Sequence, residues 1–174
     1  WSKEYPIVFP LYDHMGLCKS FLGRTMKNAE NRTKTRCPIG YSSRGLMLMN
    51  RSARRMANGV QHKEIWVAEG EMDFLAMSVR TDEPVIGIRS GSTRHLHAIP
   101  ISGKPTLYIC TDLDEAGNKY AREIAALFCD SLNIKRLTLK ERDQELDVND
   151  LINQGWTMDD LRNACEPMDL TNIR

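Results

Sequence analysis

Acidic side chains stand at the ends of three apolar segments in this 174-residue sequence, at the points where predicted strands stop. Each of these carboxylates follows such a run: Glu69 in IWVAE, Asp112 and Asp114 in TLYICTDLD, and Asp147 in ELDVND after IKRLTLK. Ionised carboxylates that crowd together repel one another, so some must take up protons or share a cation. Carboxylate, water and phosphate oxygens are the ligands that Mg²⁺ prefers. If the fold brings these acids together, they predict a divalent-metal site.

The same acids could instead cap the helices that follow them, because a negative charge favours the positive end of a helix dipole. A cap needs one acid, however, and here two or three stand at each position. Asp112 and Asp114 can face the same way in extended backbone, since strand side chains repeat every two residues. Gly117 would then allow a tight turn into the next helix. The clustering favours a shared site over separate caps.

The elements that must position these acids alternate between strand and helix from Glu64 onward. The expected strands are 64–70, 84–89 with a Ser/Gly turn at 90–91, 106–114 and 134–140. The expected helices are 71–80, 115–132, 147–155 and one after Thr157, which reads as an N-cap with Asp160 three residues on and Trp156 and Leu161 as a hydrophobic staple. Such alternation predicts an α/β fold with a parallel sheet. The carboxyl ends of parallel strands meet at one edge, where ligands bind.

The first 63 residues differ in charge and pattern. They hold 12 Lys/Arg against 3 Asp/Glu, whereas residues 64–174 hold 12 against 20. We expect a strand in 5–16 with a hairpin partner in 17–24, an exposed basic excursion over 25–45, and a helix at the end of 46–59 that stops at Gly59. The charge division suggests a part that faces a polyanion. The alternative is a chance distribution of solvated charge.

Composition bounds the class of protein. The length fits one domain, or a domain with a smaller appendage, and no apolar run reaches the roughly 20 residues that span a bilayer. The five cysteines are widely spaced without a CxxC pair, which favours free thiols over a disulfide framework or zinc ribbon. His14, Cys18 and Cys37 form a weaker metal candidate. The chain begins at Trp1, so we expect a longer parent protein.

Three motifs together resemble the Toprim domain: VAEGEMDFLA, CTDLDEAGNKYA and LDVNDLI. The resemblance covers about residues 62–155 and is strongest to primases, although Glu71 stands where primases often have an aromatic residue. It implies a Toprim-like, Rossmann-type parallel sheet flanked by helices over 63–174. The preceding IVFPLYD and GLCKSFLGR are similar to the basic subdomain before Toprim in primases, which implies a small basic α+β subdomain over 1–62.

The resemblance implies the catalytic core of a DNA primase, a nucleotidyltransferase that makes RNA primers on single-stranded DNA during replication. Glu69, Asp112 and Asp114 would be catalytic, and these three with Asp73 and Asp147 would hold Mg²⁺ or Mn²⁺. The implied partners are a single-stranded DNA template, ribonucleoside triphosphates, the RNA primer and a replicative helicase in cis or in trans, in the cytoplasm and without a membrane. The alternatives are a non-catalytic nucleic-acid-binding Toprim module of a helicase and a Toprim nuclease.

Basic residues of the first part are the candidates for contact with nucleic acid. The resemblance assigns this role to Arg24, Lys34 and Arg36. Phosphate contacts need Lys or Arg on an accessible surface, which adds Arg44 and a group on the expected helix. That group, Arg51, Arg54 and Arg55, stands at i, i+3 and i+4 and therefore on one helical face. The alternative for any single member is a merely solvated charge.

Overall fold

The structure is a computed structural model, and it describes residues 3–26, 33–89, 92–139 and 146–171. The strands in this part of the chain are β1 (Ile7–Tyr12), β2 (Cys18–Arg24), β3 (Thr35–Arg36), β4 (Leu48–Met49), β5 (Glu64–Glu69), β6 (Val85–Ile88), β7 (Thr106–Cys110), β8 (Asn133–Leu137) and β9 (Cys165–Pro167). The helices are α1 (Arg51–Ala57), α2 (Gly70–Ser78), the 3₁₀ helix η1 (Thr93–Ala98), α3 (Glu115–Phe128), α4 (Val148–Asn153) and α5 (Met158–Asn163).

A six-stranded sheet forms the centre of the molecule, in the order β4-β6-β5-β7-β8-β9. The four inner strands run parallel, with Trp66 of β5 opposite Val85 of β6 and Tyr108 of β7. The outer strands β4 and β9 pair antiparallel with β6 and β8. The predicted α/β fold with a parallel sheet is therefore confirmed. The two short edge strands were not predicted.

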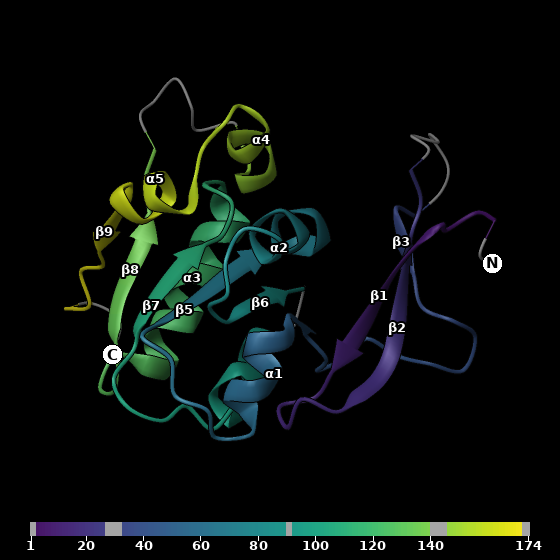
Figure 1. Cartoon of the computed structure of the whole chain (residues 1–174), viewed down its shortest axis with the longest axis horizontal. Coiled ribbons are helices and arrows are strands. Elements are labelled where there is room, and N and C mark those ends of the chain that lie inside the picture. The colour runs from purple at the N-terminus through teal and green to yellow at the C-terminus, as the bar shows by residue number, and fades with distance from the viewer. Residues whose placement is uncertain (1–2, 27–32, 90–91, 140–145, 172–174) are drawn as a thin grey trace.

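Helices cover both faces of this sheet, as Figure 1 shows. Trp66 and Ala68 of β5 point into one core with α2, α4 and α5. Ile65 and Val67 of the same strand point into a second core with α1, η1 and α3. Successive strand side chains face opposite sides of a sheet, and here both sides are buried. This explains why β5 reads as a continuous apolar run.

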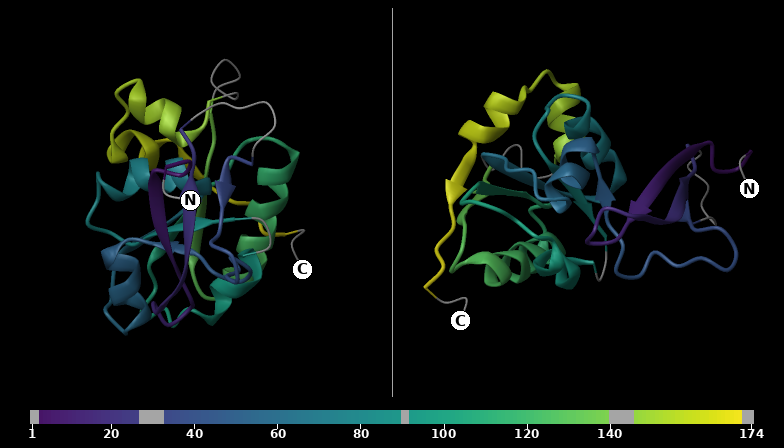
Figure 2. Two further views of the ribbon diagram at one scale, coloured as in Figure 1. Left: turned by 90° about the vertical axis from the view of Figure 1, so that its right-hand side faces the viewer. Right: turned by 60° about the horizontal axis from the view of Figure 1, so that its bottom comes forward.

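A smaller three-stranded sheet, β1-β2-β3, lies beside the larger one (Figures 1 and 2). The predicted hairpin is confirmed, since β1 and β2 pair antiparallel with Phe9 opposite Leu22. The inner side chains of the hairpin, Phe9, Leu11 and Leu22, join the core that contains Leu48 and α2. A bridge between Tyr12 and Met47 also ties β1 to the chain just before β4. The smaller sheet is thus packed onto the larger one by apolar contacts.

The segment around the expected boundary at residue 62 belongs to both parts. β4 pairs with β6, and α1 lies against β4 and β6, although both precede residue 62. Division into 1–62 and 63–174 stays a prediction. Three of the expected segments lie wholly or partly outside the described residues. They are the Ser/Gly turn at 90–91, residues 27–32 of the basic excursion, and residue 140 of the strand expected over 134–140.

Helix ends follow the expected chemistry. Gly59, with φ of 89°, lies just beyond α1, where a left-handed conformation ends a helix at no steric cost to glycine. Thr157 and Asp160 form a capping box at the start of α5, and Trp156 packs on the core that contains Leu161. The predicted N-cap at Thr157 is therefore confirmed, and the staple between Trp156 and Leu161 stays a prediction.

Two further expectations concern composition. All five cysteines are free, as the spacing predicted. In the part of the chain that the structure describes, no helix combines the length and the apolar character needed to cross a membrane.

Candidate active site

The chain changes direction across the sheet between β5 and β7. The helix after β5, α2, packs on one face of the sheet, and the helix after β7, α3, packs on the other. In open α/β sheets such a switch point leaves a crevice outside the carboxyl ends of the strands. Glu69 ends β5, and Asp112 stands two residues after the end of β7. The topology therefore brings the two acids to the same crevice.

Glu69 makes a contact that a helix cap would not make. It occupies the N-cap position of α2, but its side chain forms no capping hydrogen bond. Its Oε2 instead accepts a hydrogen bond of 3.2 Å from the backbone N–H of Asp112. Gly70, with φ of 80°, makes the sharp turn that follows. The capping interpretation therefore fails for Glu69.

Asp114 and Asp147 do cap helices. Asp114 Oδ1 accepts the N–H of Gly117 at 2.7 Å at the start of α3. Asp147 Oδ1 accepts the N–H of Asp150 at 2.7 Å at the start of α4. Capping and membership of an acidic cluster do not exclude each other, because each carboxylate has a second oxygen.

Asp73 links the acidic cluster to α4. It is 4% exposed on α2, and its Oδ1 accepts a hydrogen bond of 2.8 Å from the backbone N–H of Asn149. This bond fixes the start of α4, and with it Asp147, against α2. A carboxylate at this depth without a cationic partner is costly unless it is protonated.

The pKa values of these acids show that their charges interact. Burial, followed by repulsion from Asp112, raises the pKa of Glu69 to about 7. Burial, followed by repulsion from Asp147, raises the pKa of Asp73 to about 8, against the opposing hydrogen bond from Asn149. Burial, followed by repulsion from Asp114 and Asp147, also raises the pKa of Asp112. The five acids that the sequence selected therefore form one electrostatic cluster, named here the acidic cluster.

Gly117 has a role that differs from the predicted one. It is buried in α3, and a Cβ at this position would lie 2.0 Å from the carbonyl oxygen of Asp112. That separation is far below any contact distance, so only glycine lets α3 approach the loop that carries Asp112. Gly117 serves close packing rather than the expected tight turn.

Arg136 is a functional candidate that the sequence did not single out. From β8 it donates to the Asn118 side chain at 2.6 Å and to the Asp112 carbonyl at 3.2 Å. Burial, followed by repulsion from Arg122, lowers its pKa, while Glu69 opposes this change. Arg136 thus holds the Asp112 loop and places a positive charge near Glu69. Its position in an ordinary strand pattern gave no signal.

The donor set fits a hard divalent cation. Carboxylate oxygens are its preferred ligands, and burial, followed by repulsion between neighbouring acids, raises the pKa values of Glu69, Asp73 and Asp112. Among the described residues, no group of three or more His, Cys, Asp or Glu side chains is arranged to hold an ion by itself. Mg²⁺ sites commonly use one or two carboxylates and complete the shell with water and substrate phosphate. The same finding gives no support to the weaker candidate at His14, Cys18 and Cys37.

A cleft of about 230 Å³ opens beside the acidic cluster. It is lined by Glu69, Gly70, Glu71, Ile88, Arg89 and Tyr120. Glu71, where primases often have an aromatic residue, forms two ion pairs here. Its carboxylate contacts Arg24 of β2 at 3.1 Å and also Arg89 at the end of β6, and Arg89 donates to Thr35 of β3 at 3.2 Å. Glu71 therefore ties the small sheet to the large one at the edge of the cleft.

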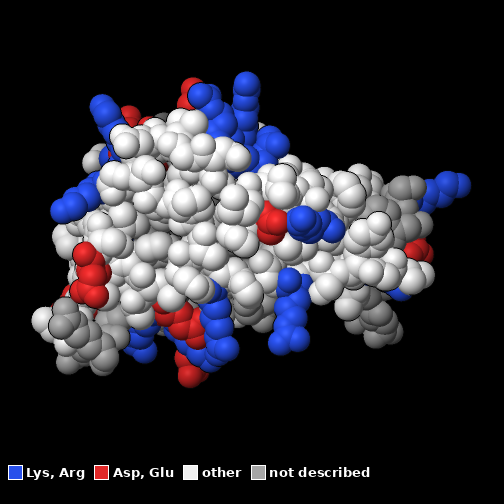
Figure 3. Space-filling view, turned by 90° about the horizontal axis from the view of Figure 1, so that it is seen from below, with Lys and Arg blue, Asp and Glu red and all other residues white. Residues whose placement is uncertain are grey.

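The other basic candidates occupy separate places. Lys34 and Arg36 are exposed on the small sheet, where Arg36 lines a shallow pocket with Pro38 and Ile39. Arg44 is exposed on the loop beside η1. On the face seen from below, Lys and Arg project in several separate groups among Asp and Glu (Figure 3).

The face of α1 lies away from the acidic cluster. Asn50, the N-cap of α1, donates from its side chain to the Glu83 carbonyl and from its backbone to Val85, at the amino end of β6. The start of α1 therefore lies beside the amino end of β6, whereas Glu69 stands at the carboxyl end of β5. Arg54 also lies over the Tyr12 ring, 5.1 Å from its centroid, which gives it a packing role. A role for this face in nucleic-acid binding stays a prediction.

The parallel sheet and the acids at its switch point define a Toprim-type α/β domain. The chain belongs to the Toprim-like family, which it matches over residues 66–152, half of its length. The resemblance that the motifs indicated is therefore confirmed. No curated protein sequence matches the chain.

Solved primase structures share the fold. A DNA primase domain from Pseudomonas aeruginosa is 21% identical with a TM-score of 0.61, over 92% of this chain and 51% of that one. The DnaG primase catalytic domain bound to ssDNA is 15% identical with a TM-score of 0.63, over 94% and 52%. The Aquifex aeolicus primase, with zinc-binding and RNA polymerase domains, is 16% identical with a TM-score of 0.64, over 95% and 41%. The chain thus spans about half the length of the structures it matches, and the likeness covers both of its sheets.

Proposed function

We propose that this chain is the metal-dependent catalytic part of a DNA primase, which joins ribonucleotides on a single-stranded DNA template. The observation that carries the proposal is the contact between the Glu69 carboxylate and the backbone N–H of Asp112 at the switch point, within the acidic cluster. The fold likeness to primase domains supports the choice of reaction within the Toprim-like family.

Glu69, Asp112 and Asp114 would hold Mg²⁺ or Mn²⁺, with Asp73 and Asp147 beside them. Such an ion, when bound, neutralises triphosphate charge and favours ionisation of the attacking 3′ hydroxyl. Asp73 would fix α4, through Asn149, so that Asp147 stays close to the other acids. Arg136 would keep the Asp112 loop in place through its bond to the Asp112 carbonyl. A manganese soak with anomalous diffraction should place a peak beside Asp112, and its absence with nucleotide present would count against this ligand set.

Glu69 is suited to a proton-transfer role. Burial, followed by repulsion from Asp112, raises the pKa of Glu69 to about 7, near the range in which a general base works best. Its position at the end of a central strand and its bond to the Asp112 N–H hold the carboxylate in one place. The residue could accept the proton of an attacking hydroxyl group or ligate the cation directly.

Partners follow from the same proposal. The substrates would be ribonucleoside triphosphates and a single-stranded DNA template, with an RNA primer as product. One of the similar structures is described as a primase catalytic domain bound to ssDNA, which supports the template assignment. A replicative helicase in cis or in trans would be a further partner, as the motif resemblance implies.

The test is incorporation of labelled ribonucleotides on a single-stranded template, with Mg²⁺ or Mn²⁺ and with a chelator. Metal-dependent products that require the template are the expected result. Binding of the template without products would favour the non-catalytic module, and shortening of the labelled template would favour the nuclease. Either result overturns the proposal, provided that the assay is repeated in a longer protein that carries this chain.

A further inference from the structure

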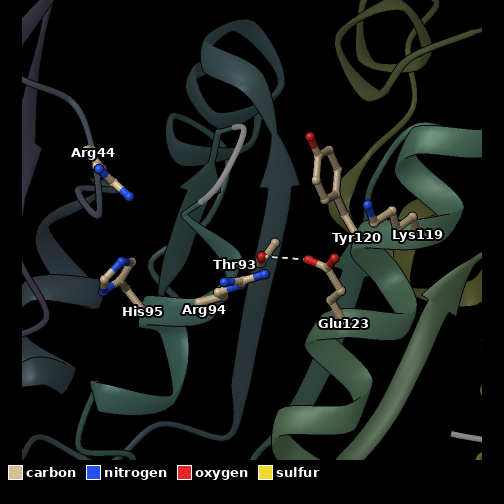
Figure 4. Close-up of a pocket in the computed structure, with 7 residues that line it drawn as sticks. All are labelled: Arg44, Thr93, Arg94, His95, Lys119, Tyr120 and Glu123. Carbon is tan, nitrogen blue, oxygen red and sulfur yellow. Dashed lines mark hydrogen bonds between the residues drawn. The ribbon is translucent and has the colours of Figure 1, made fainter.

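A second pocket, of about 460 Å³, lies between η1 and α3. It is lined by Arg44, Thr93, Arg94, His95, Lys119, Tyr120 and Glu123. Figure 4 shows Arg44 and His95 on one side of the opening, Thr93 and Arg94 at the start of η1, and Lys119, Tyr120 and Glu123 on α3. Three elements far apart in the sequence therefore contribute to one concave surface.

Positive charge dominates the pocket. Arg44, Arg94 and Lys119 are exposed, and none of them forms an ion pair with another residue that the structure describes. The one carboxylate, Glu123, accepts a hydrogen bond of 2.8 Å from the hydroxyl group of Thr93. Three cations thus face a single acid that already has a partner, which leaves a surplus of unpaired positive charge.

The loop that carries Arg44 is seated against η1. Gly45 has φ of 73°, and a Cβ at this position would lie 3.0 Å from Nε2 of His95. A side chain here would therefore be strained and would also crowd the imidazole. This close approach holds the loop beside η1, and Arg44 lines the same pocket as Arg94 and Lys119.

The pocket and the cleft at the acidic cluster share one lining residue, Tyr120. The residues that line the cleft together with Tyr120 include Glu69, Gly70 and Arg89. A ligand that spans both spaces would meet carboxylates at one end and unpaired cations at the other. A molecule with several phosphate groups fits such a surface, because some phosphates could share a cation with the acids while others pair directly with guanidinium and ammonium groups.

We propose that Arg44, Arg94 and Lys119 form a phosphate-binding site that extends the proposed active site along α3. The phosphates could belong to a ribonucleoside triphosphate or to the backbone of a single DNA strand, and the chemistry of the pocket is the same for both. The assignment of the pocket to catalysis rests on the proposed function. Phosphate binding by these three residues does not.

The experiment uses the 174-residue chain, its double variant Arg94→Ala/Lys119→Ala, and a matched double variant, Lys63→Ala/Lys104→Ala. The matched variant removes two exposed cations that precede β5 and β7, at the edge of the sheet opposite to the acidic cluster. Binding of fluorescent ATP and of a labelled oligodeoxythymidine is measured by anisotropy, with a chelator present and at several salt concentrations. Thermal melting of each variant checks that it folds.

We expect the pocket variant to weaken binding of at least one probe by about tenfold or more, while the matched variant binds as the wild type does. If the DNA strand is the ligand, the log–log salt slope for the oligonucleotide should fall by about 0.7 for each lost contact; if the triphosphate is the ligand, the effect is confined to ATP. Unchanged binding of both probes, or equal losses in the two variants, would overturn the proposal. The binding assay involves neither a metal ion nor primer synthesis. Its result would therefore stand even if the wild-type chain made no primers and the proposed function failed.

Discussion

The backbone N–H of Asp112 donates a hydrogen bond of 3.2 Å to the carboxylate of Glu69, 43 residues earlier in the chain. The bond joins the end of β5 to the loop after β7. It also explains why the Glu69 side chain turns toward Asp112 and does not cap α2. Burial and repulsion from neighbouring acids raise the pKa values of Glu69, Asp73 and Asp112, which favours protons or a cation at this edge.

Gly117→Ala should destabilise the chain and disturb the Asp112 loop. The added Cβ would lie 2.0 Å from the Asp112 carbonyl, so α3 or the loop must move. Overpacking of this kind costs about 1–3 kcal/mol, measurable by urea unfolding. Ala126→Ser, at an exposed position of the same helix, is the matched control and should change stability by less than about 0.5 kcal/mol. Equal stabilities of the two variants would contradict the packing argument.

Asp73→Asn should stabilise the chain at high pH. The pKa of Asp73 is about 8 in the folded state, against 3.8 as the ordinary value, so between these values the folded state binds more protons than the unfolded state. The contribution of Asp73 to stability is therefore full below about pH 4 and is lost as the pH rises toward 8. The asparagine side chain keeps an oxygen that can accept a hydrogen bond from the Asn149 N–H, but it cannot ionise.

The measurement is urea unfolding of both proteins at about pH 5 and about pH 8 without divalent cations. The stability of the variant relative to the wild type should rise by about 1 kcal/mol or more between the two conditions. If the stability of the variant relative to the wild type stays constant or falls as the pH rises, this account of Asp73 is wrong. The Asp73 carboxylate would then have a counter-charge or lie in contact with solvent.

Glu71→Gln should loosen the small sheet from the large one. The change leaves Arg24 and Arg89, each with a side chain 23% exposed, without their shared counter-charge. We expect the free energy of unfolding to fall by about 1–3 kcal/mol. Hydrogen exchange should become faster than in the wild type, and more so in β1 to β3 than in β5 and β7. Glu166→Gln, at an exposed position of β9, should leave both quantities unchanged. Uniformly faster exchange in both sheets would indicate general destabilisation instead.

The sequence predicted the parallel sheet because its strands are buried on both faces and its helices carry clear periodicity and capping signals. It also selected the acidic cluster, since Glu69, Asp112 and Asp147 each follow a strand. Topology turns such positions into neighbours, and alternation of strands with helices is enough to predict that topology.

Other features had no local signal. β4 and β9 hold two and three residues, too few for a period, and are strands only because a neighbour pairs with them. Arg89 and Arg136 gain their roles from contacts across the fold rather than from spacing. The spacing of Arg51, Arg54 and Arg55 is helical, as predicted, but spacing alone could not predict that the pairing of β4 with β6 places the start of this helix beside the amino end of β6.

Primer synthesis by Glu69→Gln tests the central claim most directly. Glutamine keeps the shape and an acceptor for the Asp112 N–H but removes the charge that would ligate a cation or accept a proton. Glu64→Gln is the matched control, because it removes a carboxylate from the other end of β5, where Glu64 pairs with Arg162 at 2.8 Å. The assay is incorporation of labelled ribonucleotides on single-stranded DNA beside a thermal melt, in the longer protein if needed.

Glu69→Gln should melt and bind template as the wild type does, while its synthesis falls by about 10²-fold or more. Glu64→Gln should lose some stability and retain the activity of its folded fraction. Synthesis by Glu69→Gln at the wild-type rate would contradict the account, because the acidic cluster would then have no part in the reaction.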